Sequence, residues 1–180
     1  GSFANSYLAM VNYPYQDSYK PDAFSLYQVV NAICTGDYSL LESYASTVGE
    51  TEIQTVNMLK SLDYNKVDML IIVYDLSDYI AGRALYNPLV KNDTATWTGS
   101  LNASLELLEQ TYPHIRTVIL STPASGATID GTYIDGDTVN LGSGTIPDYL
   151  NYQVSVAMEN GVSFIDNYYG VINSETREEY

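Results

Sequence analysis

Three polar residues, Asp75, Ser77 and Asp78, follow an apolar segment at residues 67–74 and could carry out acid–base or hydroxyl chemistry. Such an apolar run is typical of a strand buried on both faces, as in a parallel sheet. Ligands of these sheets bind beyond the carboxyl ends of the strands, where this cluster would lie. We therefore expect an acid, a base or a hydroxyl donor here. The alternative is structural: Asp75 and Ser77 cap the turn, and Asp78 accepts backbone N–H bonds.

Cysteine and histidine, frequent nucleophiles and bases, occur once each in the chain, as Cys34 and His114. A single cysteine permits neither an internal disulfide nor a CxxC metal site. Cys34 lies in an apolar run at residues 29–34, so we interpret it as a buried structural thiol. His114 lies at the predicted start of a strand, at the opposite end of the sheet from Asp75, and is therefore a poor candidate for a base.

Alternating helix and strand patterns surround the polar cluster and would position it. Helices are predicted at residues 22–35, 50–62, 95–111 and 146–160, and strands at residues 67–74, 115–121 and 162–166. This order gives β-α-β crossovers, so we expect a three-layer α/β/α sandwich with a mostly parallel sheet, similar to flavodoxin. Residues 124–145 are rich in Gly, Ser, Thr and Asp and predict a long surface loop. Without an internal repeat or a linker, residues 1–180 are predicted to form one domain.

Composition restricts the partners that the chain can have. Of its 180 residues, 22 are acidic and 7 are basic, which gives a formal net charge of −15 and argues against nucleic acid. Because 46% of the residues are hydrophobic and only 16% are charged, we expect a folded domain rather than a disordered acidic segment. No stretch reaches the roughly 18 apolar residues that a membrane span needs. The scarcity of lysine and the 18 tyrosines favour an exported bacterial protein.

The order of these patterns resembles the SGNH (GDSL-type) hydrolases over about residues 22–180. Residues 67–79 resemble the third block of that family, in which an apolar strand leads to Gly-x-Asn-Asp. Residues 112–123 and 162–168 resemble the next strand and the strand before the last block. The resemblance implies an esterase or acylhydrolase that acts on an acylated carbohydrate or a small ester, without a cofactor or metal. In the family, Gly-Asp-Ser supplies the nucleophile and Asp-x-x-His supplies the base.

The chain departs from the family pattern at each of these blocks. Asp75 occupies the Gly position of the third block and Ser77 its oxyanion-hole Asn position, so that only Asp78 matches. Gly1 could correspond to the oxyanion donor of the second block. Neither Gly-Asp-Ser nor Asp-x-x-His occurs in the sequence. We therefore expect residues 1–180 to lack the nucleophile and base blocks, to be inactive alone, and to need a partner chain or self-association to cover exposed sheet edges.

A non-catalytic role is the alternative to a hydrolase. The chain would then bind a ligand or a protein through the crevice at the strand ends or through a tyrosine-rich surface. The residues of that surface would be Tyr7, Tyr13, Tyr15, Tyr19 and Tyr27. Tyrosine supplies a large amphipathic contact area, although packing over the sheet explains the same residues. The carboxylates of residues 130–137 lack the spacing of an EF-hand, so we interpret them as a solvated turn rather than a calcium site.

Overall fold

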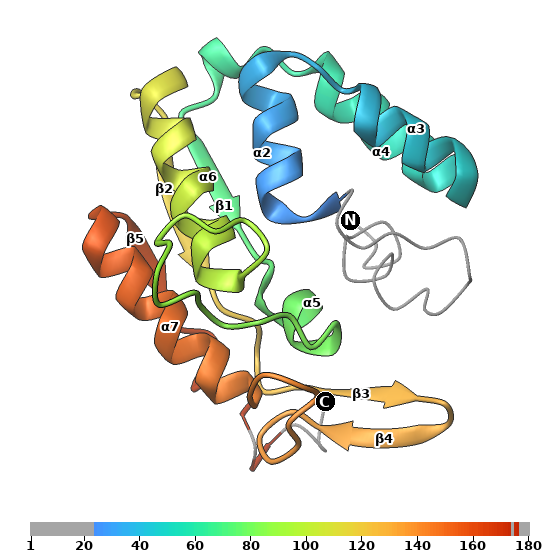
Figure 1. Ribbon diagram of the computed structural model, residues 1–180, viewed down its shortest axis with the longest axis vertical. Helices are drawn as coiled ribbons and strands as arrows, with labels where there is room; N and C mark the ends of the chain where they lie inside the picture. Colours follow the sequence, from blue (N-terminus) through green and yellow to red (C-terminus); the bar gives the residue numbers. More distant parts are fainter. Residues whose placement is uncertain (1–23, 174, 177–180) are drawn as a thin grey trace.

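A three-stranded parallel sheet lies at the centre of the fold (Figure 1). The computed structural model describes residues 24–173, 175 and 176. The strands are β1 (Met69–Ile72), β2 (Arg116–Leu120) and β5 (Ser163–Ile165), in the order β1-β2-β5. Val118 of β2 is paired with Ile71 on one side and with Ser163 on the other. Helices flank this sheet, which confirms the predicted mixed α/β class and is consistent with a three-layer α/β/α fold.

Helix α6 (Trp97–Thr111) lies between α2 (Leu26–Thr35) and α7 (Ile146–Asn160) and packs against both. The apolar residues of α6 that the periodicity predicts to point inward are all buried: Trp97, Leu101, Leu105 and Leu108. They join Ile72, Ile119 and the inward side chains of α7 in the main core. The ends of α7 also agree with the sequence, because Thr145 and Asp148 form a capping box and Gly161 ends the helix with a φ of 64°.

A second, smaller core forms around a helix that the sequence pattern did not predict. Helices α3 (Ser39–Val48) and α4 (Glu50–Ser61) form a hairpin, and only α4 was expected. Leu41 and Tyr44 of α3 pack with Val56 of α4 and with Phe24. The short helix η3 (Tyr64–Lys66) then leads into β1. Cys34 of α2 is half-buried rather than fully buried, and its Sγ lies 3.9 Å from the carbonyl oxygen of Leu107.

The prediction that the first strand is buried on both faces is wrong. Side chains alternate between the two faces of a strand, and Ile72 is buried while Met69 and Ile71 are more than half exposed. Ile165 of β5 is exposed in the same way. Leu70, Ile72 and Ile119 contribute to the main core, in which they pack with side chains of α2, α6 and α7. In the described sheet, β1 and β5 are therefore edge strands, and one face carries exposed apolar side chains.

Two further segments differ from the predicted loops. The residues after β1 form a short helix, α5 (Asp75–Ile80), instead of a turn. The predicted loop at residues 124–145 contains an antiparallel hairpin of β3 (Gly126–Ile129) and β4 (Thr132–Asp135). Asp130 and Gly131 connect its strands with φ values of 50° and 76°, and an Asp-Gly pair is a common two-residue hairpin turn. This hairpin includes most of the segment that was considered as a calcium loop.

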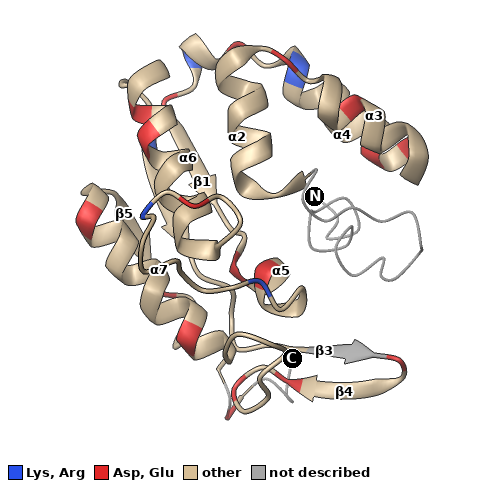
Figure 2. Cartoon of the chain, in the orientation of Figure 1, with Lys and Arg blue, Asp and Glu red and all other residues tan. Residues whose placement is uncertain are grey.

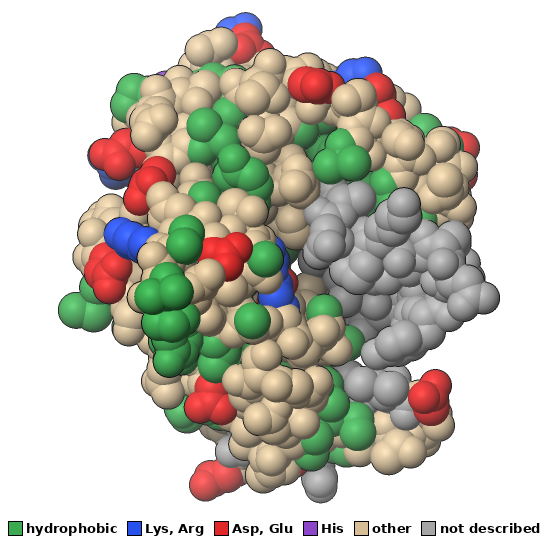
Figure 3. Space-filling view, viewed as in Figure 1, with side chains coloured by type: hydrophobic (Ala, Val, Ile, Leu, Met, Phe, Trp, Pro, Cys, Tyr) green, Lys and Arg blue, Asp and Glu red, His purple; other side chains and the backbone are tan. Residues whose placement is uncertain are grey.

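The acidic residues are spread over the helices and turns of the described chain rather than gathered in one segment (Figure 2). On the face shown in Figure 3, hydrophobic side chains gather over α7. Among the described residues, no helix combines the length and the apolar character that crossing a bilayer requires. Gly1 and all the tyrosines of the proposed tyrosine-rich surface except Tyr27 lie outside the described residues.

The start of α6 depends on a glycine. Thr96 caps the helix by accepting a hydrogen bond from the backbone N–H of Gly99 at 3.2 Å. A Cβ added at Gly99 would clash with the backbone of Asp93. We therefore expect Gly99→Ala to lower the free energy of unfolding by about 1–3 kcal/mol, because the 93–96 turn must move. Urea denaturation measures this change. Glu109→Ala on the same helix is the control, and we expect it to change the free energy of unfolding by no more than about 0.5 kcal/mol. An equally small change for Gly99→Ala would contradict the prediction.

Candidate functional site

The predicted polar residues gather at the carboxyl ends of β1 and β2. We call Asp75, Ser77 and Asp78 of α5, together with Ser121 and Thr122 after β2, the strand-end cluster. All five residues are buried, with exposed fractions between 1% and 5%. Helix α5 begins directly after β1, so its first turn lies at the end of the strand (Figure 1). This is the place where open parallel sheets bind ligands.

Asp75 joins the ends of two neighbouring strands. Its Oδ1 accepts a hydrogen bond from the backbone N–H of Leu76 at 3.0 Å, and its Oδ2 accepts one from Thr122 at 2.9 Å. Burial raises the pKa of Asp75 from its ordinary value of 3.8 to about 6, although these backbone hydrogen bonds act in the opposite direction. Both carboxylate oxygens of Asp75 therefore hold the backbone in place, as the structural alternative for this residue predicts.

Asp78 forms a buried ion pair with Arg83. The Oδ1 of Asp78 lies 2.8 Å from Nη1 of Arg83, and the two side chains are 7% and 10% exposed. The same guanidinium donates hydrogen bonds to the carbonyl oxygens of Thr94 and Ala95. In Figure 2 a basic segment lies beside the acidic one of α5. The pair therefore attaches the end of α5 to the turn that precedes α6.

Ser77 differs from the other members of the strand-end cluster because its side chain has no partner among the described residues. Its Oγ is fully buried and forms no hydrogen bond with any residue that the structure describes. The hydroxyl of Ser121, by contrast, accepts hydrogen bonds from the backbone N–H groups of Asn167 at 2.8 Å and Tyr168 at 3.0 Å. Buried polar groups are normally paired, so an unpartnered hydroxyl is a candidate for binding a ligand.

No cysteine or histidine joins this cluster. The Nε2 of His114 lies 3.2 Å from the carbonyl oxygen of Tyr64, just before β2 and at its amino end, as the sequence predicts. Burial raises the pKa of the Cys34 thiol, which disfavours the thiolate form. Among the described residues, no group of three or more His, Cys, Asp or Glu side chains could hold a metal ion. The strand-end cluster therefore offers three hydroxyl groups, of Ser77, Ser121 and Thr122, and two carboxylates.

Sequence reasoning missed two residues that support the cluster. Arg83 follows Asp78 at a spacing of five residues, which is not a helical pairing distance, so only the folded chain brings the two together. Tyr149 of α7 donates a hydrogen bond from its hydroxyl to the carbonyl oxygen of Arg83. Burial, with the nearby Asp78 as a smaller cause, raises the pKa of Tyr149, so that it remains a neutral donor.

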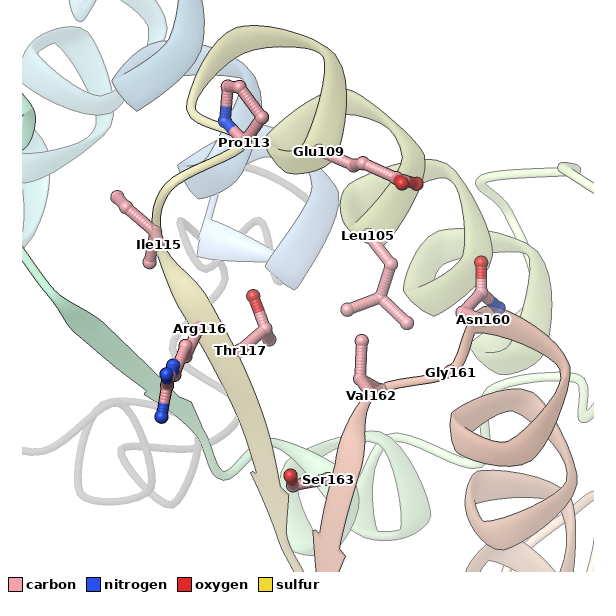
Figure 4. Close-up of a pocket in the computed structure, with 10 residues that line it drawn as sticks. All are labelled: Leu105, Glu109, Pro113, Ile115, Arg116, Thr117, Asn160, Gly161, Val162 and Ser163. Atoms are coloured by element: carbon pink, nitrogen blue, oxygen red, sulfur yellow. The ribbon is translucent and has the colours of Figure 1, made fainter.

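A separate pocket lies at the opposite end of the sheet, where β2 and β5 begin. It has a volume of about 270 Å³ and shares no residue with the strand-end cluster. Leu105, Thr117 and Val162 lie near its centre, with Glu109 of α6 at one side (Figure 4). It contains none of the residues to which the sequence assigns chemistry, so we keep the strand-end cluster as the candidate site.

The raised pKa of Asp75 predicts a pH dependence of stability. The stabilisation from the protonated carboxyl is fully present below about pH 3.8 and is lost as the pH rises through about 6. The difference between a pKa of 3.8 in the unfolded chain and about 6 in the folded chain corresponds to about 3 kcal/mol of unfolding free energy. We expect the difference in unfolding free energy between the natural chain and Asp75→Asn to change by this amount between pH 3.5 and pH 7, with the natural chain losing stability as the pH rises. Urea denaturation across this pH range measures it, and a constant difference would contradict the prediction.

Comparison with known proteins supports the fold but identifies no family. No protein-family model matches the sequence, and no curated protein matches it. A protein from Chitinophaga pinensis described as a possible lipase has a similar structure, with a TM-score of 0.54 and 15% identity over 83% of this chain and 51% of its own. A protein from Lactobacillus plantarum is similar with a TM-score of 0.50 and 17% identity, over 63% of this chain and 52% of its own. The matched parts are thus about half of each solved chain, and the likeness supports the α/β fold.

Proposed function

We propose that this chain is part of an SGNH (GDSL-type) ester hydrolase in which the Ser77 hydroxyl stabilises the oxyanion of the reacting ester. In ester hydrolysis the bond between the acyl carbon and the alkoxy oxygen breaks, and the oxygen of water forms a new bond to the acyl carbon. The products are a carboxylic acid and an alcohol. Negative charge develops on the carbonyl oxygen during this step. The observation that carries the proposal is the buried Ser77 Oγ, which has no partner among the described residues at a ligand-binding edge of the sheet.

The neighbours of Ser77 would act as positioning residues. Asp75, two residues earlier, is fixed to Thr122 at the end of β2, and Asp78, one residue later, is fixed to Arg83. Ser77 therefore lies in a short helix that is held at both sides by buried polar contacts. Holding a donor in place before the reaction is what makes it effective, because no reorganisation is then needed as the charge develops. The Asp78–Arg83 pairing also balances one negative charge near the site.

The nucleophile and the base would come from outside the described residues. We propose that they belong to Gly-Asp-Ser and Asp-x-x-His segments of a longer polypeptide, because neither motif occurs in residues 1–180. The structural similarity extends over about half of each of two solved proteins, one of which is described as a possible lipase, and this supports the proposal. The substrate class would be an acylated carbohydrate or a small ester. Serine-dependent ester hydrolysis needs neither a metal nor a cofactor.

The test compares the complete natural polypeptide with residues 1–180 alone. We expect the complete polypeptide to hydrolyse p-nitrophenyl acetate and to release acetate from acetylated xylan. We expect residues 1–180 to give only the rate of the buffer. Failure of the complete polypeptide on both substrates would overturn the hydrolase proposal. Turnover by residues 1–180 would instead overturn the proposed outside origin of the nucleophile and base.

A non-catalytic binding module is the second candidate. The observation that favours it is that both oxygens of Asp75 are used by backbone N–H groups, while the described cluster contains no histidine. The crevice would then hold an ester or an acylated sugar through Ser77 without cleaving it. Calorimetric binding of acetylated xylo-oligosaccharides to the complete polypeptide, without release of acetate, would favour this function over hydrolysis.

A further inference from the structure

A second concave site lies on α6 and α7, where residues 86–91 cross them. This groove has a volume of about 570 Å³, within the range of small-molecule sites. It shares no residue with the strand-end cluster. The lining residues that carry the following argument are Tyr86, Lys91, Thr98, Asn102, Tyr152 and Glu159. The groove thus combines aromatic, amide, hydroxyl and charged side chains from three segments of the chain.

One wall of the groove is a pair of stacked tyrosines. The ring centroids of Tyr86 and Tyr152 are 5.2 Å apart, and the ring planes differ by 24°. Tyr86 is 52% exposed although it packs on this partner, so part of its surface remains open to solvent. In Figure 3 hydrophobic side chains gather on this face of the molecule over α7. A tyrosine pair of this kind provides a flat, rigid surface of mixed apolar and polar character.

The groove also contains two buried polar side chains that carry hydrogen-bonding groups. Thr98 and Asn102 are four residues apart on α6, on one helix face, and both are buried. The Oδ1 of Asn102 accepts a hydrogen bond from Asn160 at 2.8 Å, but its Nδ2 donates to no described residue. Thr98, which also lines the groove, contributes a hydroxyl group. Neither atom is among the described side-chain atoms that are fully buried without a partner, so a ligand in the groove can replace water as their partner.

The surroundings of the groove are electrically balanced and well fixed. Lys91 and Glu159 form an ion pair at 3.7 Å, so their opposite charges neutralise each other. Asn87 anchors the crossing segment, because its Nδ2 donates to Asp93 at 2.7 Å and its Oδ1 accepts from the N–H of Leu89 at 2.9 Å. A charged ligand would have to displace an existing pairing, whereas a neutral one would not. The features therefore favour a neutral ligand with hydroxyl groups.

We propose that this groove binds a neutral carbohydrate, with a pyranose ring lying on Tyr86 and its hydroxyl groups bonded to Thr98 and Asn102. A sugar ring has apolar C–H faces and polar edges, which match a tyrosine wall beside amide and hydroxyl donors. An apolar protein segment would cover the Asn102 Nδ2 and the Thr98 hydroxyl without offering either a hydrogen-bond partner. The proposal is independent of the proposed hydrolase, because none of its residues belongs to the strand-end cluster.

The test is saturation-transfer NMR of residues 1–180 with xylotetraose, cellotetraose, mannotetraose and chitotetraose, each at low-millimolar concentration. We expect at least one of them to receive saturation at its ring protons. We expect Tyr86→Ala to weaken its binding by about tenfold, and Thr98→Val to weaken it as well. Tyr133→Ala is the matched control, because Tyr133 is similarly exposed, at 58%, on the β3–β4 hairpin. Neither this variant nor Ser77→Ala should change the affinity.

Three results would overturn the proposal. The first is that none of the four sugars binds. The second is that a sugar binds equally well to Tyr86→Ala. The third is that Ser77→Ala abolishes binding, since the sugar would then occupy the strand-end cluster. Binding of the apolar dye ANS that depends on Tyr86, without binding of any sugar, would assign the groove to an apolar protein partner instead.

Discussion

Replacing Arg83 with methionine is expected to lower the free energy of unfolding by about 3–5 kcal/mol, because the variant removes the guanidinium from a buried ion pair. The pair has a separation of 2.8 Å, and both side chains are at most 10% exposed. Methionine retains much of the apolar stem but neither the charge nor the donors to Thr94 and Ala95. The carboxylate of Asp78 would then be buried without its cation. Urea denaturation at neutral pH measures the loss.

Two controls separate this pairing from a general effect of losing an arginine. Arg116→Met changes an exposed arginine of β2, so we expect a change within about 0.5 kcal/mol. The double variant with Asp78→Leu should recover part of the stability, since it also removes the buried carboxylate. If Arg83→Met and Arg116→Met have equal effects, the buried pair does not stabilise the fold as described.

Replacing Ser77 with alanine is expected to lower kcat for p-nitrophenyl acetate by about 10²–10³ in the complete natural polypeptide, the typical effect of losing one oxyanion donor. KM should change little, because the contact strengthens only as charge develops in the transition state. Stability should not fall, since the Ser77 hydroxyl has no partner among the described residues to lose. Steady-state kinetics and urea denaturation of the same preparation measure the two effects separately.

The helices with clear periodicity and strong end signals could be predicted from the sequence. α7 agrees at both ends because Thr145, Asp148 and Gly161 supply local hydrogen bonds and a left-handed backbone. α3 was missed because its buried residues depend on packing against α4 and Phe24. The β3–β4 hairpin was missed although Asp130-Gly131 is a turn signal. The polar composition of the surrounding residues outweighed that signal.

The candidate site could be predicted in part. Asp75, Ser77 and Asp78 follow a strand directly, so their position at its carboxyl end depends only on local order. Their partners could not be predicted from the sequence. Thr122 lies at the end of another strand, and Arg83 follows Asp78 at a distance along the chain that matches no regular helix or strand periodicity. The exposure of Met69 and Ile71 was also unexpected, because an apolar run does not show which faces of a strand are covered.

Whether the Ser77 hydroxyl stabilises the oxyanion, as we propose, is tested by the ratio of the kcat values of two alanine variants of the complete polypeptide. Ser100 of α6 is the matched control, because it too is a buried serine whose Oγ has no partner among the described residues. We predict that kcat of Ser77→Ala is about 10²-fold or more below that of Ser100→Ala, while their unfolding midpoints are similar. Equal kcat values for the two variants would contradict the claim.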